Sequence, residues 1–354
     1  MRLHATARFI FAALLTSTAN PTAGPSSPPV PPVAVDCSTS RPIDEQGFVR
    51  IGGIEQWITI RGERCANPVI LFLHGGPGNP NSPYAEAIYA AWEKEFTLVQ
   101  WDQRGSAKTF GRNAPPASLT IEQMTRDGLE VAAYLGERLG QKIILLGGSW
   151  SSVLGVHMAK ARPDLFHVYL GVGQLVKYQD NQAASYQQTM RLAEQAGDSK
   201  SVAALVALGP PPWVNPRAFG ALRRVTRTYE AKTAIPAPAH WWDRSAAYAT
   251  PAALAEYEGG EEFSYLQFVG LAGDGMLSKV DLPALGSDFQ IPIFLVQGEA
   301  DLVTVPDIAL SYFNSISAPQ KQYRSVATAG HDPNAALVDA QLDLLRTRIR
   351  PLIQ

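Results

Sequence analysis

The chain alternates short apolar runs with longer segments in which apolar residues recur at helical spacing. Four runs are rich in Val, Ile, Leu and Phe, which is typical of strands buried in a parallel sheet. They cover residues 68–73, 97–101, 143–146 and 291–296. A long amphipathic helix is predicted between an N-cap at Thr120 and Gly140 directly after its end. Strands that alternate with helices predict a doubly wound, mostly parallel sheet of the α/β class with right-handed crossovers.

A glycine pair and two further runs extend the predicted sheet. Residues 48–51 and 54–60 flank Gly52-Gly53, which is a hairpin signal. Residues 167–172 and 322–326 indicate two more strands.

One long segment departs from this alternation. Between residues 173 and 288, stretches rich in Ala, Gln and Glu are interrupted by proline-rich breaks, and no apolar strand is evident. We therefore expect a core made of residues 47–172 and 289–354, with residues 173–288 inserted as a helical cap.

The first residues have the pattern of an export signal. Two arginines precede an apolar stretch at residues 9–15, and Ser17-Thr18-Ala19 supplies small residues for cleavage. The apolar stretch is far too short to span a bilayer permanently. Residues 1–19 are predicted to be the signal peptide of a periplasmic or secreted protein, and residues 20–46 a proline-rich linker and N-terminal lead.

The net charge gives no reason to expect a charged partner, and the two cysteines suggest a disulfide in an oxidising compartment. The 354 residues are 46% hydrophobic and carry a formal net charge of −2, as in an ordinary soluble protein with a sizeable core. We therefore expect neither nucleic acid nor an anionic membrane as a partner, and nothing in the sequence specifies an oligomeric state. In an exported protein, Cys37 and Cys65 are expected to form a disulfide, and the alternative is two unpaired thiols. No cysteine or histidine has metal-ligand spacing, so neither a metal nor a cofactor is expected.

The run at residues 143–146 leads into a glycine-rich turn that carries a serine. The turn is Gly147-Gly148-Ser149-Trp150-Ser151, and the residues after it have the spacing of a helix packed on a sheet. This context makes a G-x-S-x-G match credible as a nucleophile elbow. The last position is Ser151 rather than glycine, a mild departure because serine is also small. The alternative is a helix-capping serine in an ordinary strand-to-helix turn.

A serine nucleophile needs a base and a carboxylate that orients the base. In this architecture the chain order is serine, acid, histidine. Asp301 and His331 each come just after a predicted strand, so both are expected at the carboxyl edge of the sheet near Ser149. The three residues therefore form the candidate catalytic set.

Two other carboxylates compete with Asp301 for the role of the acid. Glu299 is only two residues away and stays a rival on sequence grounds. Asp307 follows a proline at a predicted helix start, where a carboxylate satisfies backbone N–H groups, so it is the weaker rival.

A second glycine-rich stretch follows the first apolar strand. In His74-Gly75-Gly76-Pro77-Gly78 the glycines can present backbone N–H groups without a Cβ in the way. The amides of Gly76 and of Trp150, the residue after the serine, are the expected oxyanion donors. The alternative for this stretch is a simple turn.

Three stretches together resemble the signatures of the prolyl aminopeptidase (proline iminopeptidase) family of α/β-hydrolases. They are His74-Gly75-Gly76-Pro77-Gly78, Trp101-Asp102-Gln103-Arg104-Gly105 and Gly147-Gly148-Ser149-Trp150. The similarity covers about residues 47–172 and 291–354. The resemblance implies an α/β-hydrolase fold with an inserted helical cap. It also implies release of an N-terminal residue, usually proline, from a small peptide whose amine is held by acidic side chains under the cap.

The cap is where the chain departs from the family pattern. Composition alone suggests four amine-binding candidates, with Gly75 of the glycine-rich loop as a further substrate contact. The four candidates are Glu256, Glu258, Glu261 and Glu262. The alternative for these glutamates is a solvated helix end.

These observations favour an exported serine hydrolase of prolyl aminopeptidase type. Ser149 would attack a carbonyl, His331 would act as general base and then acid, and Asp301 would fix the histidine tautomer. An esterase or lactonase with the same groups is the alternative among enzymes that act on a small acyl substrate. A non-catalytic ligand receptor is the alternative from another class, because a fold does not fix a function.

Overall fold

The computed structural model describes residues 34–37, 41–115 and 118–353. These residues belong to one compact unit. The predicted signal peptide, residues 1–19, and most of the predicted lead at residues 20–46 lie outside the described part of the chain.

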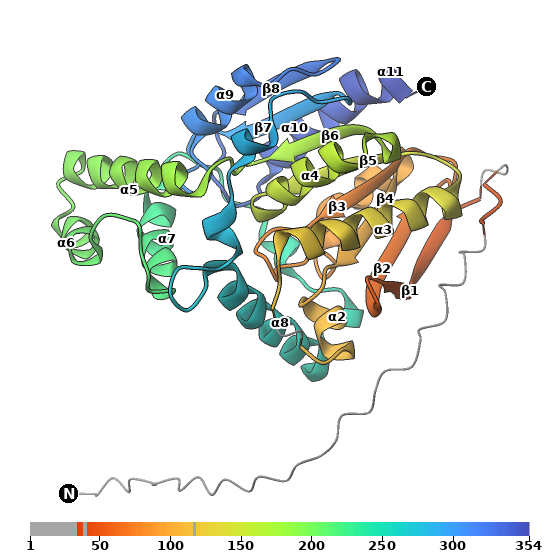
Figure 1. The fold of residues 1–354 in the computed structure, drawn as a ribbon, viewed down its shortest axis with the longest axis horizontal. Helices are drawn as coiled ribbons and strands as arrows, with labels where there is room; N and C mark the ends of the chain where they lie inside the picture. The colour runs from red at the N-terminus through yellow and green to blue at the C-terminus, as the bar shows by residue number, and fades with distance from the viewer. Residues whose placement is uncertain (1–33, 38–40, 116–117, 354) are drawn as a thin grey trace, which may run out of the picture. The chain divides into compact units, whose positions relative to one another are not determined.

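One eight-stranded sheet organises the described residues (Figure 1). Its strands lie side by side in the order β1-β2-β4-β3-β5-β6-β7-β8. Their bounds are β1 Ile43–Ile51, β2 Ile54–Gly62, β3 Val69–Leu73, β4 Thr97–Asp102, β5 Ile143–Gly148, β6 Phe166–Val172, β7 Ile293–Gly298 and β8 Lys321–Val326. β2 pairs antiparallel with β1 and β4, and all other neighbours are parallel. The predicted mostly parallel α/β sheet is therefore confirmed.

Helices cover both faces of this sheet (Figure 1). Those of the predicted core are α1 Ala85–Tyr89, α2 Ala107–Arg112, α3 Ile121–Leu139, α4 Trp150–Ala161, α9 Pro306–Ser315, α10 Ala335–Leu344 and α11 Arg350–Ile353. Shorter turns are Ala90–Lys94, Pro163–Leu165, Ala239–Trp242, Ala246–Tyr248, Met276–Lys279, Leu282–Leu285 and the π-helical Leu345–Ile349. The α3 helix has the predicted ends: Thr120 accepts the backbone N–H of Gln123, and Gly140 is left-handed.

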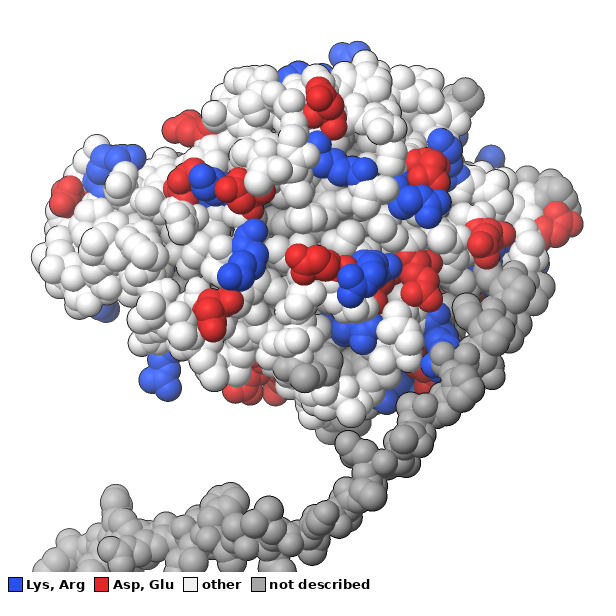
Figure 2. Space-filling view, in the orientation of Figure 1, with Lys and Arg blue, Asp and Glu red and all other residues white. Residues whose placement is uncertain are grey.

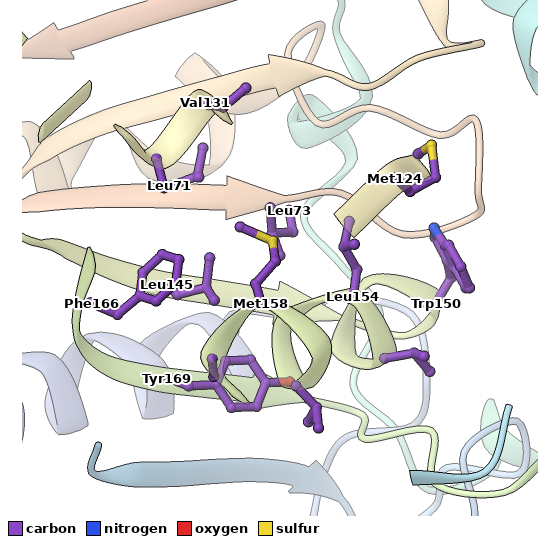
Figure 3. Packing of buried hydrophobic residues seen from close by; sticks show 14 of the residues in the cluster. Leu71, Leu73, Met124, Val131, Leu145, Trp150, Leu154, Met158, Phe166 and Tyr169 are labelled. Carbon is purple, nitrogen blue, oxygen red and sulfur yellow. The ribbon is translucent and has the colours of Figure 1, made fainter. Parts of the chain in front are cut away.

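Successive residues of a central strand enter different hydrophobic clusters, because side chains alternate across the sheet. On β3, Leu71 joins a cluster with α3 and α4, whereas Phe72 joins a second cluster with Trp92 and the C-terminal helices. Figure 3 shows the first cluster, in which Leu145 of β5 points toward Met158 of α4. Burial on both faces explains why these strands are apolar almost throughout.

The segment between β6 and β7 folds as helices, in two parts. Its helices are α5 Tyr178–Gln195, α6 Ser199–Leu208, α7 Arg217–Glu230 and α8 Pro251–Val269. The first three share a small cluster that includes Leu205, Leu222 and Tyr229. In contrast, α8 lies on core loops: the ring of Phe268 is 5.1 Å from the ring of Trp150. The inserted segment therefore touches the core along α8, and it also does so at the end of α7, where Glu230 accepts the Leu302 N–H.

Two elements differ from expectation because tertiary pairing forms them. β1 begins at Ile43, so residues 43–46 of the predicted lead belong to the sheet. There Ile43 pairs with Gly62, although the first residues of this strand are mostly polar. The short helix α2 was not predicted at all. Six residues do not make a stable helix alone, and α2 is supported by its packing against α8.

The N-terminal lead is fastened to the sheet by a disulfide between Cys37 and Cys65. Cys65 is buried in the turn after β2. On the face in Figure 2, Lys and Arg are interspersed with Asp and Glu. None of the helices in the described ranges is long and apolar enough to cross a membrane.

Candidate active site

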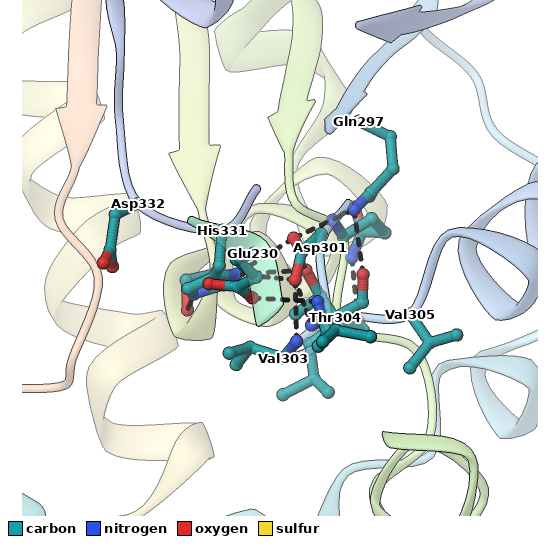
Figure 4. A network of polar contacts seen from close by, with 12 residues as sticks. Glu230, Gln297, Asp301, Val303, Thr304, Val305, His331 and Asp332 are labelled. Carbon is teal, nitrogen blue, oxygen red and sulfur yellow. Dashed lines mark hydrogen bonds and ion pairs between the residues drawn. The ribbon is translucent and has the colours of Figure 1, made fainter. Parts of the chain in front are cut away.

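Three side chains from separate loops meet at the carboxyl edge of the parallel strands. Ser149 follows β5, Asp301 follows β7 and His331 follows β8. Ser149 Oγ lies 2.9 Å from His331 Nε2, and His331 Nδ1 lies 3.0 Å from Asp301 Oδ2. Figure 4 shows Asp301 and His331 within a larger polar network. In this arrangement the imidazole can take the serine proton while the carboxylate fixes the ring.

Ser149 lies at a sharp turn between strand and helix. Its φ of 56° and ψ of −125° are rarely adopted by a residue with a side chain. A Cβ at Gly147 would lie 2.6 Å from the carbonyl oxygen of Ser151, so the turn requires glycine there. Ser151 is fully buried; its hydroxyl donates to the Leu73 carbonyl of β3 and accepts the Gly148 N–H at 3.0 Å. The departure from the motif therefore fastens the turn to a neighbouring strand.

The carboxylate of Asp301 is buried among hydrogen-bond donors. The N–H groups of Val303 and Thr304 donate to Oδ1, both at 2.8 Å. Thr304 Oγ1 and Gln297 Nε2 donate to Oδ2 at 2.6 and 3.0 Å. Sequence reasoning missed Thr304 and Gln297, although a threonine three residues after an aspartate is a turn signal.

The two rival acids lie apart from the histidine. Glu299 is exposed and accepts a hydrogen bond from Ser325 Oγ at 2.8 Å. Asp307 is exposed in the first turn of α9, as its position after a proline predicts. Within the described ranges, neither makes a hydrogen bond or an ion pair to His331.

The pair of acid and base is electrostatically coupled. Burial alone would raise the pKa of Asp301, but the charge of His331 and hydrogen bonds from His331 and Thr304 outweigh it and hold this pKa below its ordinary value. Burial alone would lower the pKa of His331, but the charge of Asp301 and its hydrogen bond outweigh it and raise this pKa. An ionised acid beside an easily protonated imidazole suits general base catalysis near neutral pH.

The glycine-rich loop lies directly against the serine. A Cβ at Gly75 would be 3.4 Å from Ser149 Cβ, so a side chain at position 75 would touch the nucleophile's side chain. Gly76 is left-handed with φ of 107°. Trp150 opens α4, where the first N–H groups have no acceptor within the helix. The predicted oxyanion donors thus lie on the two segments that flank Ser149.

A neutral histidine joins this loop to the second signature stretch. Burial lowers the pKa of His74 to about 4, so its ring is uncharged at neutral pH. Its Nδ1–H donates to the Gly75 carbonyl at 2.9 Å, and its Nε2 accepts the Gln103 N–H at 3.1 Å. Arg104 of the same stretch forms a buried ion pair with Asp127 of α3 at 2.7 Å. These residues hold the loop rather than face a substrate.

The structure separates the four cap glutamates, which all lie on α8. Glu258 and Glu262 are exposed, whereas Glu256 and Glu261 are half-buried. Glu256 lies against α2. Glu261 is on the face that covers the glycine-rich loop, since a Cβ at Gly78 would be 2.9 Å from its Cα. Glu261 is therefore the best placed of the four to reach a substrate.

Sequence reasoning also missed a buried acid beside the base. Glu230, the last residue of α7, is 5% exposed. Its Oε1 accepts the Leu302 N–H at 2.9 Å, and its Oε2 accepts from Arg223 Nη1 at 2.6 Å. The sequence could have indicated that Glu230 is buried, because it lies four residues after Thr226 on the same face of the helix. Within the described part of the chain, no group of His, Cys, Asp or Glu side chains could hold a metal ion.

A doubly wound sheet, a serine at a strand-to-helix turn, and an acid and a histidine in later loops define the class of α/β-type hydrolases. The chain belongs to the alpha/beta hydrolase fold family, whose model matches residues 68–335.

Named relatives within this family include peptidases. The chain is 28% identical to the probable aminopeptidase YbaC of Bacillus subtilis over 300 residues, which are 80% of this chain and 89% of the relative. It is 33% identical to a proline iminopeptidase of Neisseria meningitidis over 122 residues, 33% of this chain and 36% of that relative. The chain thus matches little more than a third of the latter's length. These relatives confirm the predicted resemblance to prolyl aminopeptidases.

Solved structures agree in fold. The proline iminopeptidase of Mycobacterium smegmatis has a TM-score of 0.58 at 16% identity, over 87% of this chain and 97% of that one. An esterase from Thermogutta terrifontis has a TM-score of 0.54 at 16% identity, over 88% of this chain and 100% of that one. At this identity the likeness concerns the fold alone, which peptidases and esterases share.

Proposed function

We propose that the protein is a serine hydrolase in which Ser149 attacks an acyl carbon, with His331 as general base and then acid. The observation that carries the proposal is the hydrogen-bonded series from Ser149 Oγ through His331 to the carboxylate of Asp301. Asp301 stays ionised, fixes the histidine tautomer and stabilises the imidazolium that forms. The amides of Gly76 and Trp150 stabilise the oxyanion of the tetrahedral intermediate.

We infer further that the substrate is a small peptide with a free N-terminal residue, as for a prolyl aminopeptidase. The names of the relatives support this substrate class. The position of the half-buried Glu261, whose Cα lies against the glycine-rich loop, supports it independently. A carboxylate in such a position favours an ammonium group through charge-assisted hydrogen bonds.

One panel of substrates tests the proposal. Aminoacyl arylamides, led by the prolyl compound, are compared with their N-acetylated counterparts and with short-chain aryl esters, with Ser149→Ala as the blank. We expect the free-amine prolyl arylamide to be cleaved fastest. Preference for the esters would replace the peptidase with an esterase or lactonase. A wild-type protein that a fluorophosphonate probe does not label would point to a ligand receptor instead.

We also propose that the protein is exported. The basic, apolar and small-residue pattern at residues 1–19 supports export, and so does the disulfide between Cys37 and Cys65, which would not persist in a reducing cytosol.

A further inference from the structure

The end of cap helix α7 contacts the loop that carries the predicted acid. Glu230 Oε1 accepts the backbone N–H of Leu302, the residue after Asp301, at 2.9 Å. Both partners are buried: Glu230 is 5% and Leu302 3% exposed. A buried N–H without an acceptor would destabilise the fold, because it loses its hydrogen bonds to water without replacement. The carboxylate therefore holds the backbone directly beside the acid.

The same carboxylate packs against the loop that carries the base. A Cβ at Gly330, the residue before His331, would lie 3.1 Å from Glu230 Cβ and 3.4 Å from its Cδ. Arg223 donates to Glu230 Oε2 at 2.6 Å and forms an ion pair with Asp332, the residue after His331, at 2.8 Å. Glu230 and Arg223 thus contact the residues on either side of His331 (Figure 4 labels Glu230, His331 and Asp332).

The chain that follows α7 continues this contact. Ile235 donates its backbone N–H to the Thr328 carbonyl at 2.9 Å, and Asn334 Nδ2 donates to the carbonyls of Ile235 and Thr328, both at 2.9 Å. The cap and the histidine loop are therefore joined by backbone as well as side-chain hydrogen bonds. Glu230 is the group among them that also reaches the acid loop.

We propose that Glu230 is a positioning residue: its carboxylate joins the cap to the loops of both Asp301 and His331 and keeps the two in hydrogen-bonding distance. This inference rests on the proposed function of Ser149, His331 and Asp301. It assigns the cap a part in forming the catalytic geometry, apart from any contact with substrate. Glu230 is already bonded to Leu302 and Arg223, which argues against a free amine as its main partner.

The charge of Glu230 gives the proposal a second measurable consequence, a change in the pKa of His331. Four charged groups lie around His331: Asp301, Glu230, Arg223 and Asp332. Glu230 acts to raise the pKa of His331 and Arg223 acts to lower it. Replacing Glu230 by a neutral residue removes one of the negative charges that raise the pKa of His331, so this pKa falls while Asp301 still holds it up. Because only the neutral imidazole accepts the serine proton, the acidic limb of the activity profile should move to lower pH.

The test measures the rate at which a fluorophosphonate probe labels Ser149, which does not depend on the identity of the substrate. Glu230→Ala removes both the acceptor and the charge and should slow labelling about 10–100-fold, since small misplacement of reacting groups costs up to about 10²-fold. Glu230→Gln keeps an acceptor for Leu302 and should lose less than about tenfold, with its acidic limb at lower pH. Glu194→Gln, the same change at an exposed position of α5, is the matched control and should behave as wild type.

Each outcome decides a separate point. Wild-type labelling rates and an unmoved acidic limb in both Glu230 variants would overturn the positioning role. A higher KM for free-amine substrates alone, with N-acetylated substrates spared, would also overturn it by making Glu230 a substrate ligand. Should Glu230→Ala not fold, the pH profile of Glu230→Gln decides. Failure of the wild type to be labelled would instead refute the proposed function.

Discussion

Among single residues, Ser149 combines its proposed role as nucleophile with backbone strain. Its left-handed conformation, with φ of 56°, costs on the order of 1–3 kcal/mol in a residue with a side chain. The strain places Oγ 2.9 Å from His331 Nε2. Stability is thus lowered at the position where the proposed chemistry requires the hydroxyl to be exposed to a substrate.

Two separate variants of Ser149, each with a small residue, distinguish the loss of the hydroxyl from the backbone strain. Ser149→Ala should abolish turnover and keep the strain, whereas Ser149→Gly should abolish turnover and raise the free energy of unfolding by about 1 kcal/mol relative to Ala. Urea unfolding and steady-state kinetics measure both quantities. Wild-type kcat in the alanine variant would contradict the nucleophile, and equal stability of the two variants would contradict the strain.

The acid is tested by a pair of amide substitutions two residues apart. Asp301→Asn should leave an oriented histidine in the wrong tautomer and lower kcat by roughly 10⁴-fold. Glu299→Gln, at the exposed neighbouring carboxylate, should leave kcat near the wild-type value. The assignment of the acid is wrong if the two variants behave the other way round.

At the level of elements, α8 is a part of the cap that lies on the core. Its inner face contacts two segments that follow strands of the sheet: Ser264 Oγ donates to the Gly105 carbonyl at 2.8 Å, and Phe268 packs on Trp150. Glu261 follows Tyr257 by one helical turn on this face, whereas Glu258 is exposed. Of these two glutamates, Glu261 is therefore the one whose backbone lies against the glycine-rich loop.

Neutralising the four glutamates of α8 one at a time should single out Glu261. A charge-assisted hydrogen bond contributes about 1.5–3 kcal/mol, so Glu261→Gln should lower kcat/KM for a free-amine substrate by roughly one to two decades. Its N-acetylated counterpart should be spared. The equivalent changes at Glu256, Glu258 and Glu262 serve as controls. Wild-type selectivity in all four variants would mean that this helix does not bind the amine.

At the level of the whole molecule, the disulfide closes the N-terminal lead onto the sheet. Cys37 and Cys65 are separated by 28 residues, a loop whose closure stabilises a protein by about 3–4 kcal/mol in the chain-entropy estimate. If residues 1–19 are removed on export, the mature chain should begin near Asn20. The intact mass after alkylation, measured before and after reduction, shows both where the chain begins and whether the two cysteines are paired. A full-length product with two alkylated thiols before reduction would contradict export and pairing together.

Local patterns were enough to predict most of the sheet and the three members of the candidate triad. An apolar run such as that of β3 indicates a buried parallel strand by itself, and the glycines before Ser149 indicate a sharp turn. Asp301 and His331 were found because each closely follows a strand, and the carboxyl ends of parallel strands share one edge. These signals lie within a few residues of the groups they locate.

Other features depended on contacts between distant parts of the chain. Glu230 meets Leu302 across 72 residues, and Ser151 meets Leu73 across 78, so the local sequence does not reveal the partner of either residue. Composition alone could not choose Glu261 among four glutamates, because the choice depends on which face of α8 covers the glycine-rich loop. Short-range periodicity determines which elements form. The packing of those elements, which depends on shape and burial over the whole molecule, determines which polar side chains are enclosed beside Ser149.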